Sequence, residues 1–548
     1  MSFLIVAVVG LLAVAAAAAF APRMRIAAPL ILVVVGIGVS FLPFIPAVEV
    51  DPEWILAGVL PPLLYSASVS MPTMNFRREF TAIGGLSVAL VVLSSLVIGV
   101  FFAWMIPGLG FWWGIALGAI VSPTDAVATS IVKKVGVSGR VVSVLEGESL
   151  LNDATALVLL RTAIAGTAAA VSFWGVLGTF AYAVAVAVVF GFIVGHVNLW
   201  VRSKVTDSTV NTVISFTVPF LASIPAELLG ASGLVAAVVA GLITGHGAAR
   251  RLSPQHRLSD SQNWHVIELV LEGAVFLIMG LELFGIVVDV QEAHSGLGLA
   301  LAVAAAALLL ILLVRAAYVS PLLVGLRRRA RRAERVKPRL DVMQQRLEGG
   351  KSAFTAPLPG RPTPNPERIE RVKSRTRRTI ADIEFLLAAP LGWRDGGILV
   401  WAGMRGAVTV AAAQTLPAET PNRSLLVLIA FIVAAGSLLL QGGTLRAFVA
   451  WIRPVPVRDD LNNEERRRIL TLLAEIDHDV RAEAGDMSED EAHAAAKKLD
   501  LAVIAAQRTA LLDARDDGAF TAETLNGALV NLDADQISIE LKGAPPEL

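Results

Sequence analysis

The stretch EGESLLNDATALVLL (residues 146–160) sets carboxylates and an amide inside an otherwise apolar run. An Asp or Glu at the centre of a membrane-spanning helix costs about 2.5–3.5 kcal/mol on insertion scales, so it needs a reason. Glu148 and Asn152 are four residues apart. Ser149 and Asp153 have the same spacing, so all four side chains share one face of a helix. The pattern favours an ion or proton site; the alternative is a hydrogen-bond network that ties helices together.

The chain around this stretch has the composition of a membrane protein. It has 548 residues, 55% hydrophobic and 17% charged, with a mean hydropathy of +0.68. The apolar residues form runs of about 20, the length that crosses a hydrocarbon core about 30 Å thick. We therefore expect an all-α polytopic membrane protein. The apolar stretch 1–21 has no basic leader, so we interpret it as the first spanning helix.

Thirteen membrane-spanning helices are expected from the apolar runs. They are residues 3–21, 26–43, 53–71, 80–105, 111–132, 141–166, 171–201, 209–228, 232–248, 264–288, 297–325, 395–416 and 424–451. Lys and Arg gather in every second connection, for example at Arg77 and Lys133. By the positive-inside rule, this asymmetry places the N-terminus outside and the C-terminus in the cytoplasm. The chain is expected in the inner (cytoplasmic) membrane.

This topology predicts two six-helix halves of opposite orientation. Inverted repeats of this kind place an ion site near the membrane midplane, on broken helices. The fifth and twelfth predicted helices carry matching polar interruptions, SPTDAVAT at 122–129 and GMRGAVT at 403–409. We expect both helices to break there and to cross.

Two segments are expected to lie in the cytoplasm. The insertion at 327–392 starts with a basic stretch, 327–378, that has 17 Lys and Arg against 5 Asp and Glu, with a proline-rich middle. Contact with anionic lipid is its simplest reading. The tail, 456–548, is helical in pattern and has 21 acidic against 10 basic residues from Arg458 onward. The two charges should attract, and salt should screen the attraction. The remaining membrane transport domain is predicted at 1–455.

The first interruption offers oxygen ligands. Pro123 removes a backbone donor and frees carbonyls in the preceding turn. Thr124 and Asp125 follow directly, and a hydroxyl and a carboxylate beside free carbonyls suit a cation such as Na+. A second interpretation of Asp125 is equally supported: its carboxylate compensates the helix ends that the break exposes.

Two arginines and two further acids lie in apolar surroundings. Arg315 needs a counter-charge, and Glu148 is the natural candidate. Arg405 is interpreted first as compensating a helix dipole and second as a ligand contact. Glu272 and Glu282, in EGAVFLIMGLEL, have no assigned partner.

The sequence lacks the residues that several classes of function require. The sequence has no cysteine, so it can form no disulfide and no thiolate site. It has no P-loop for ATP-driven transport and no GxSxG or HExxH motif for hydrolysis. We expect no enzyme activity, no cofactor and no nucleic-acid partner.

The motifs together resemble a known family. GESLLNDATALVL (147–159), SPTDAVA (122–128), PPLLYSA (61–67), FLIMGLEL (276–283), Arg315 and WAGMRGAV (401–408) are similar to the cation–proton antiporters that include the eukaryotic Na+/H+ exchangers and the NhaP proteins. The resemblance covers about 450 residues of the membrane region.

The resemblance implies roles for the site residues. Asp153 matches the aspartate that binds cation and proton in turn, and Asn152 the asparagine of the electroneutral branch. Glu148 and Arg315 match the ion pair that holds this asparagine. Ser149, Thr124 and Asp125 match positions around the ion, and Arg405 lies in the second break. Ser66 departs from the pattern, because many relatives have a carboxylate there.

The resemblance also implies an architecture and a function. The family forms homodimers in which core helices, here about 80–166 and 297–451, slide against dimerisation helices, here about 3–71 and 209–288. We expect electroneutral, elevator-type exchange of Na+ or Li+ for H+ across the bilayer. Exchange of K+ for H+ is the alternative that Ser66 favours. A membrane sensor without transport is a further alternative, and it would not need Asp153 and Asn152 together.

Overall fold

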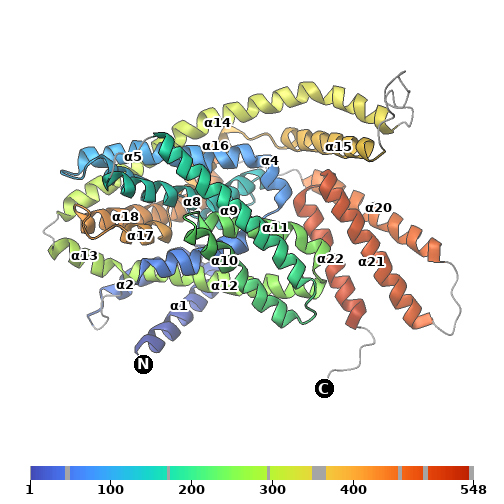
Figure 1. The fold of residues 1–548 in the computed structure, drawn as a ribbon, viewed down its shortest axis with the longest axis horizontal. Helices are drawn as coiled ribbons and strands as arrows, with labels where there is room; N and C mark the ends of the chain where they lie inside the picture. The colour runs from blue at the N-terminus through green and yellow to red at the C-terminus, as the bar shows by residue number, and fades with distance from the viewer. Residues whose placement is uncertain are drawn as a thin grey trace. The chain divides into compact units, whose positions relative to one another are not determined.

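The computed structural model describes residues 2–43, 50–168, 173–292, 296–348, 366–453, 459–484 and 492–541, and all regular structure within these ranges is helical (Figure 1). The first part of the chain forms α1 (Ser2–Met24), α2 (Ala28–Ser40), η1 (Trp54–Val59), α3 (Leu60–Ser70), α4 (Thr73–Gly84), η2 (Gly85–Leu90), α5 (Val91–Met105), α6 (Phe111–Val121), α7 (Val127–Val135), α8 (Gly139–Ala168) and α9 (Phe173–Arg202). The middle forms α10 (Ser208–Leu228), α11 (Gly233–Arg251), α12 (Pro254–Leu281), α13 (Leu283–Glu292), α14 (Leu297–Glu348) and α15 (Pro366–Ala388). The last part forms α16 (Trp393–Trp401), α17 (Ala407–Gln414), α18 (Arg423–Ser437), η3 (Leu438–Gly442), α19 (Gly443–Ile452), α20 (Asp459–Ala484), α21 (Ala492–Asp517) and α22 (Ala522–Leu541). The η segments are short π-helical turns that continue the neighbouring α-helices.

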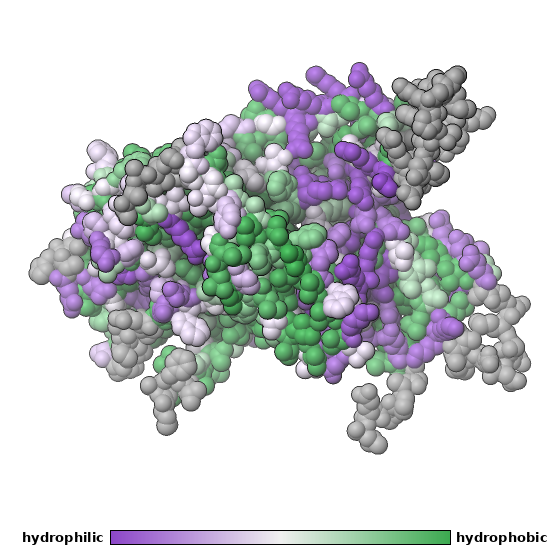
Figure 2. All heavy atoms as spheres, viewed as in Figure 1, coloured by the Kyte–Doolittle hydropathy of each residue, from purple (hydrophilic) through white to green (hydrophobic). Residues whose placement is uncertain are grey.

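The apolar helices are those of a multi-pass membrane protein. Among the described residues, eight helical stretches are long and apolar enough to cross a membrane, including α1, Leu177–Arg202 within α9, and Thr73–Met105, which joins α4, η2 and α5. On the outer face of α9, Val189, Phe192 and Ile193 are more than half exposed. Figure 2 shows hydrophobic side chains gathered over α9 and its neighbours. Such a face is stable against lipid and costly in water, so the all-α membrane class is confirmed.

Both predicted helix interruptions are present. α6 ends at Val121 and α7 begins at Val127, while α16 ends at Trp401 and α17 begins at Ala407. The two breaks meet, because the backbone N–H of Asp125 donates to the carbonyl of Met404 at 2.8 Å. The close approach requires glycine at position 406, where a Cβ atom would collide with the Asp125 carboxylate.

Two predicted helices differ from those observed. The helix predicted at 264–288 is observed as α12 and α13, which start ten residues earlier and are separated at Glu282. The helix predicted at 297–325 continues as α14 to Glu348, far into the basic stretch. α15 forms the other end of that stretch, and its proline-rich middle at 357–364 lies outside the described residues.

The chain divides into two compact units. One contains Met1–Gly247, Ser259–Leu323 and Leu391–Pro456, and it holds the apolar helices and the two breaks. The other contains Ala248–Leu258, Val324–Pro390 and Val457–Leu548. The second unit therefore groups the basic insertion with the tail.

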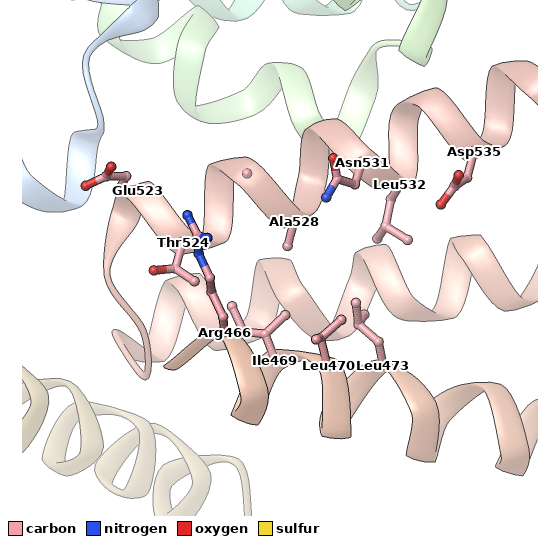
Figure 3. Close-up of a pocket in the computed structure, with 11 residues that line it drawn as sticks. Arg466, Ile469, Leu470, Leu473, Glu523, Thr524, Ala528, Asn531, Leu532 and Asp535 are labelled. Atoms are coloured by element: carbon pink, nitrogen blue, oxygen red, sulfur yellow. The ribbon is translucent and has the colours of Figure 1, made fainter. Parts of the chain in front are cut away.

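The tail is a bundle of α20, α21 and α22. Its core is formed by apolar side chains spaced for one helical face, which are Ile469, Ile504, Leu511, Leu512, Phe520, Leu525, Leu529 and Leu532. A cavity lies between α20 and α22, lined by Ile469 and Leu473 with Arg466 and Asp535 beside it (Figure 3).

The acidic tail contacts basic segments of the same unit. Asp517 accepts a hydrogen bond from Ser374 of α15 at 2.9 Å and lies 3.7 Å from Arg377. This bears out the expected attraction between the basic stretch and the tail. The tail also binds the end of α11, where Arg250 pairs with Asp516 at 2.7 Å, and the start of α12, where Arg257 pairs with Asp533.

Candidate functional site

A buried ion pair joins α8 to α14. The Arg315 guanidinium donates to both carboxylate oxygens of Glu148, at 2.5 and 2.8 Å, and both residues are 2% exposed. Arg315 Nε also donates to the carbonyl of Leu399 at 2.8 Å. A Cβ atom at position 403 would lie 2.5 Å from Arg315 Nε, so this approach requires Gly403. The bidentate contact compensates two charges that would otherwise be costly inside the protein.

Asn152 is tied to this ion pair through Thr124. The Asn152 amide nitrogen donates to the Thr124 carbonyl at 2.8 Å and to its hydroxyl oxygen at 2.9 Å. The Thr124 hydroxyl donates in turn to Glu148 at 3.0 Å. Asn152 is fully buried, and its amide oxygen has no hydrogen-bond partner within the described ranges. The chain of contacts therefore fixes Asn152 beside the break between α6 and α7.

Asp153 is buried but not neutralised by the protein. It is 9% exposed and lines a small cavity with Pro123 of the first break and with Val408 and Ala412 of α17. No donor in the described part of the chain hydrogen-bonds its carboxylate, and Ser149 donates to the carbonyl of Glu146 instead. A buried carboxylate without donors is strongly disfavoured unless it binds a proton or a cation.

Arg405 compensates carbonyl groups at both breaks. Its Nε donates to Val121 O at 2.8 Å, and its terminal nitrogens donate to the carbonyls of Ser122 and Gly403. Val121 and Ser122 end α6, where the negative end of the helix dipole lies. Arg405 therefore compensates a helix dipole, as the first interpretation predicts. Most of its hydrogen bonds are with the end of α6, in the other broken helix, and not with its own.

Asp125 is engaged with helix ends. Its carboxylate accepts from the backbone N–H of Val127 at 2.8 Å, at the start of α7. This contact supports its reading as compensation for an exposed helix end. Of the four predicted oxygen ligands, Asp153 lines the cavity, while hydrogen bonds tie Thr124, Asp125 and Ser149 to other groups.

Three features of the site were not indicated by the sequence. They are the bridging role of Thr124, the close-packed glycines at 403 and 406, and the surroundings of Glu282. The close packing of the two glycines could have been predicted from the sequence, because both lie next to or near an arginine in a helix break, in GMRG at 403–406.

Comparison with known proteins shows which family and which relatives the chain is similar to. A family model described as sodium/hydrogen exchanger, transmembrane, matches residues 9–339 and 376–451. An uncharacterized Na+/H+ exchanger of Escherichia coli K12 is 36% identical over 273 residues, which cover 48% of this chain and 49% of that protein. The match thus spans about half the length of that relative. The Na+/H+ antiporter NhaP of Pseudomonas aeruginosa is 27% identical over 400 residues, 71% of this chain and 79% of the relative.

A solved structure has the same fold. The sodium proton antiporter MjNhaP1 from Methanocaldococcus jannaschii superposes with a TM-score of 0.56 at 16% identity, covering 82% of this chain and 99% of that one.

Proposed function

The chain belongs to the sodium/hydrogen exchanger family, and on this premise we propose that it exchanges Na+ or Li+ for H+, with Asp153 as the residue that binds either ion. The observation that carries the proposal is the Asp153 carboxylate, buried in a cavity between two broken helices without a hydrogen-bond donor in the described chain. A proton and a Na+ ion each neutralise it, and it cannot hold both. Competition for one carboxylate couples the two flows.

Asn152 makes the exchange electroneutral in this proposal. Its amide is uncharged, so only Asp153 changes charge when one Na+ replaces one H+. The ion pair of Glu148 and Arg315 acts through Thr124 as a positioning device, because it holds Asn152 in place by the contacts described above. Arg405 and Asp125 stabilise the helix ends that the breaks expose.

The proposed setting is the inner (cytoplasmic) membrane, with the N-terminus outside and the C-terminus in the cytoplasm. The charge asymmetry of the connections supports this orientation. We also propose a homodimer, in which core helices at about 80–166 and 297–451 slide against dimerisation helices at about 3–71 and 209–288.

Ion preference follows from the oxygen atoms around Asp153. Ser66 is 5% exposed, and it stands at a position where the resemblance to the antiporter family implies a carboxylate in many relatives. Exchange of K+ for H+ is therefore the second candidate, since a weaker ligand field favours the larger and more easily dehydrated ion.

Dequenching of a pH-sensitive dye in everted vesicles tests the proposal. Adding Na+ or Li+ should dissipate a preformed pH gradient, and Asp153→Asn should abolish the response. Asp289→Asn, an exposed aspartate of α13, is the matched control and should respond like the wild type. An Asp153→Asn variant that still exchanges Na+ at near wild-type rate would show that the site is elsewhere, and a response to K+ alone would favour the second candidate.

A further inference from the structure

α14 carries a row of arginines just beyond its membrane-spanning part. The helix runs without interruption from Leu297 to Glu348, and its apolar run ends at Leu326 (Figure 1). Five of the arginines that follow share one face, because steps of three and four residues return to the same side of a helix. We call them the arginine stripe, which consists of Arg328, Arg331, Arg332, Arg335 and Arg339.

The arginine stripe is exposed, and the opposite face of α14 is packed. All five stripe side chains are exposed, whereas Ala330, Ala333 and Leu340 on the opposite face are partly buried. On that face Lys337 pairs with Glu384 of α15 at 2.8 Å. Within the described ranges, no acidic side chain lies at salt-bridge distance from any arginine of the stripe. The stripe therefore points away from α15 and keeps its charge.

Two exposed tryptophans mark the membrane surface at this end of α14. Trp393 starts α16 and is 67% exposed, and Trp451 lies at the end of α19 and is 77% exposed. Tryptophan is enriched at the level of the lipid headgroups. Gly396 of α16 packs against Leu323 of α14, where a Cβ atom would collide with the leucine. About one turn beyond this contact, α16 begins at Trp393 and the apolar run of α14 ends at Leu326, so the surface lies near this level.

The arginine stripe extends from the headgroup layer outward. This layer is about 5–8 Å thick on each side of the hydrocarbon core. With a rise of about 1.5 Å per residue, Arg328, Arg331 and Arg332 lie about 3–9 Å beyond the apolar run, within reach of the headgroups. Arg335 and Arg339 lie further out, within about a Debye length of the layer at physiological salt. All five can therefore interact with charge at the membrane surface.

The chemistry of the stripe selects an anionic, phosphate-bearing partner. Guanidinium groups on one face repel one another unless anions balance them. Each guanidinium presents a planar fork of donors that matches two phosphate oxygens. Clusters of about four to eight Lys or Arg directly beyond a membrane-spanning helix are typical of segments that bind anionic lipids.

We propose that the arginine stripe binds the headgroups of anionic phospholipids in the leaflet from which α14 emerges. Arg328, Arg331 and Arg332 contact the headgroups directly, while Arg335 and Arg339 add long-range attraction. The start of the basic insertion is thereby held at the membrane surface. The rival is that these arginines only fix the orientation of α14, as the positive-inside rule requires, and prefer no lipid.

Native mass spectrometry of the purified full-length chain tests the proposal. The chain is titrated with phosphatidylglycerol or with phosphatidylcholine of the same acyl chains, and the wild type should bind phosphatidylglycerol more tightly. The triple variant Arg328→Gln/Arg331→Gln/Arg332→Gln should weaken the tightest phosphatidylglycerol binding at least about tenfold, because each arginine near the surface contributes about fivefold. Glutamine is a good helix former and the three side chains are exposed, so the variant should fold.

The matched control removes the same charge from a helix that does not continue a membrane-spanning one. Arg466→Gln/Arg467→Gln/Arg468→Gln changes three exposed arginines of α20 and should leave phosphatidylglycerol binding unchanged. Replacing the three stripe arginines by lysine keeps the charge and should retain most of the binding.

Three results would overturn the lipid site. One is equal affinity of the wild type for the two lipids, and another is phosphatidylglycerol binding by the triple variant that equals that of the wild type or of the α20 control. The third concerns polyphosphate, a soluble polyanion: if the wild type binds it as tightly as phosphatidylglycerol and the triple variant loses both, the partner is a soluble polyanion and not a lipid. None of these measurements involves ion exchange, so the outcome is independent of the proposed antiport.

Discussion

The ion pair of Glu148 and Arg315 allows a prediction with a magnitude. Both side chains are 2% exposed and share two hydrogen bonds of 2.5 and 2.8 Å. Glu148→Gln leaves a buried guanidinium with only the Leu399 carbonyl, and Arg315→Gln leaves a buried carboxylate with only the Thr124 hydroxyl. Each single change should therefore cost about 3–5 kcal/mol of stability. The double change removes both charges, so its cost should fall below the sum of the two by at least about 2 kcal/mol.

A double-mutant cycle measured by denaturant unfolding in micelles gives this coupling. The matched control is the pair of Lys133 and Glu146, because Glu146 lies on the same helix two residues from Glu148, while Lys133 is 56% exposed. Its coupling should stay below about 1 kcal/mol, since solvent screens an exposed pair. Additive losses at Glu148 and Arg315 would refute the pairing and, with it, the proposed support of Asn152.

Three further predictions follow from the same contacts. Exchange with Na+ should keep nearly the same rate when a K+ gradient with valinomycin imposes a membrane potential, because Asn152 adds no charge; strong acceleration by either sign contradicts one-for-one exchange. Gly403→Ala should lower thermal stability and slow exchange at least tenfold, because its Cβ would meet Arg315 Nε at 2.5 Å, whereas Gly84→Ala, with open space around its Cβ, should be tolerated. Removing residues 459–548 should speed exchange in vesicles at low ionic strength and have little effect at high salt, which screens the contact of Asp517 with Arg377; an equal rate at every salt concentration excludes restraint by the tail.

The sequence predicted features that one helix determines alone. A carboxylate and an amide four residues apart fix a shared face, which placed Glu148 and Asn152 together on α8. Pro123 and the glycines of the second interruption predicted the two breaks, because proline lacks a donor and glycine weakens a helix. An arginine isolated in an apolar run requires a partner, which indicated Arg315 with Glu148.

The sequence did not predict features that depend on how distant segments meet. Arg405 binds carbonyls more than 280 residues earlier, and Gln414 faces Glu282 from another helix. Helical periodicity gives the face of a residue but not the element opposite that face. The sequence did not predict the ion pair between Arg257 and Asp533 of the tail for the same reason. An acidic tail can pair with many of the basic residues, and the sequence does not show which of them lies opposite.

Proton release from the purified protein on addition of Na+ tests the central claim, that one carboxylate binds either ion. In weakly buffered solution near neutral pH, the wild type should release close to one proton for each Na+ bound at Asp153. Asp153→Asn should lose most of this release, and Asp289→Asn should keep it. An Asp153→Asn protein that releases protons like the wild type would contradict the account.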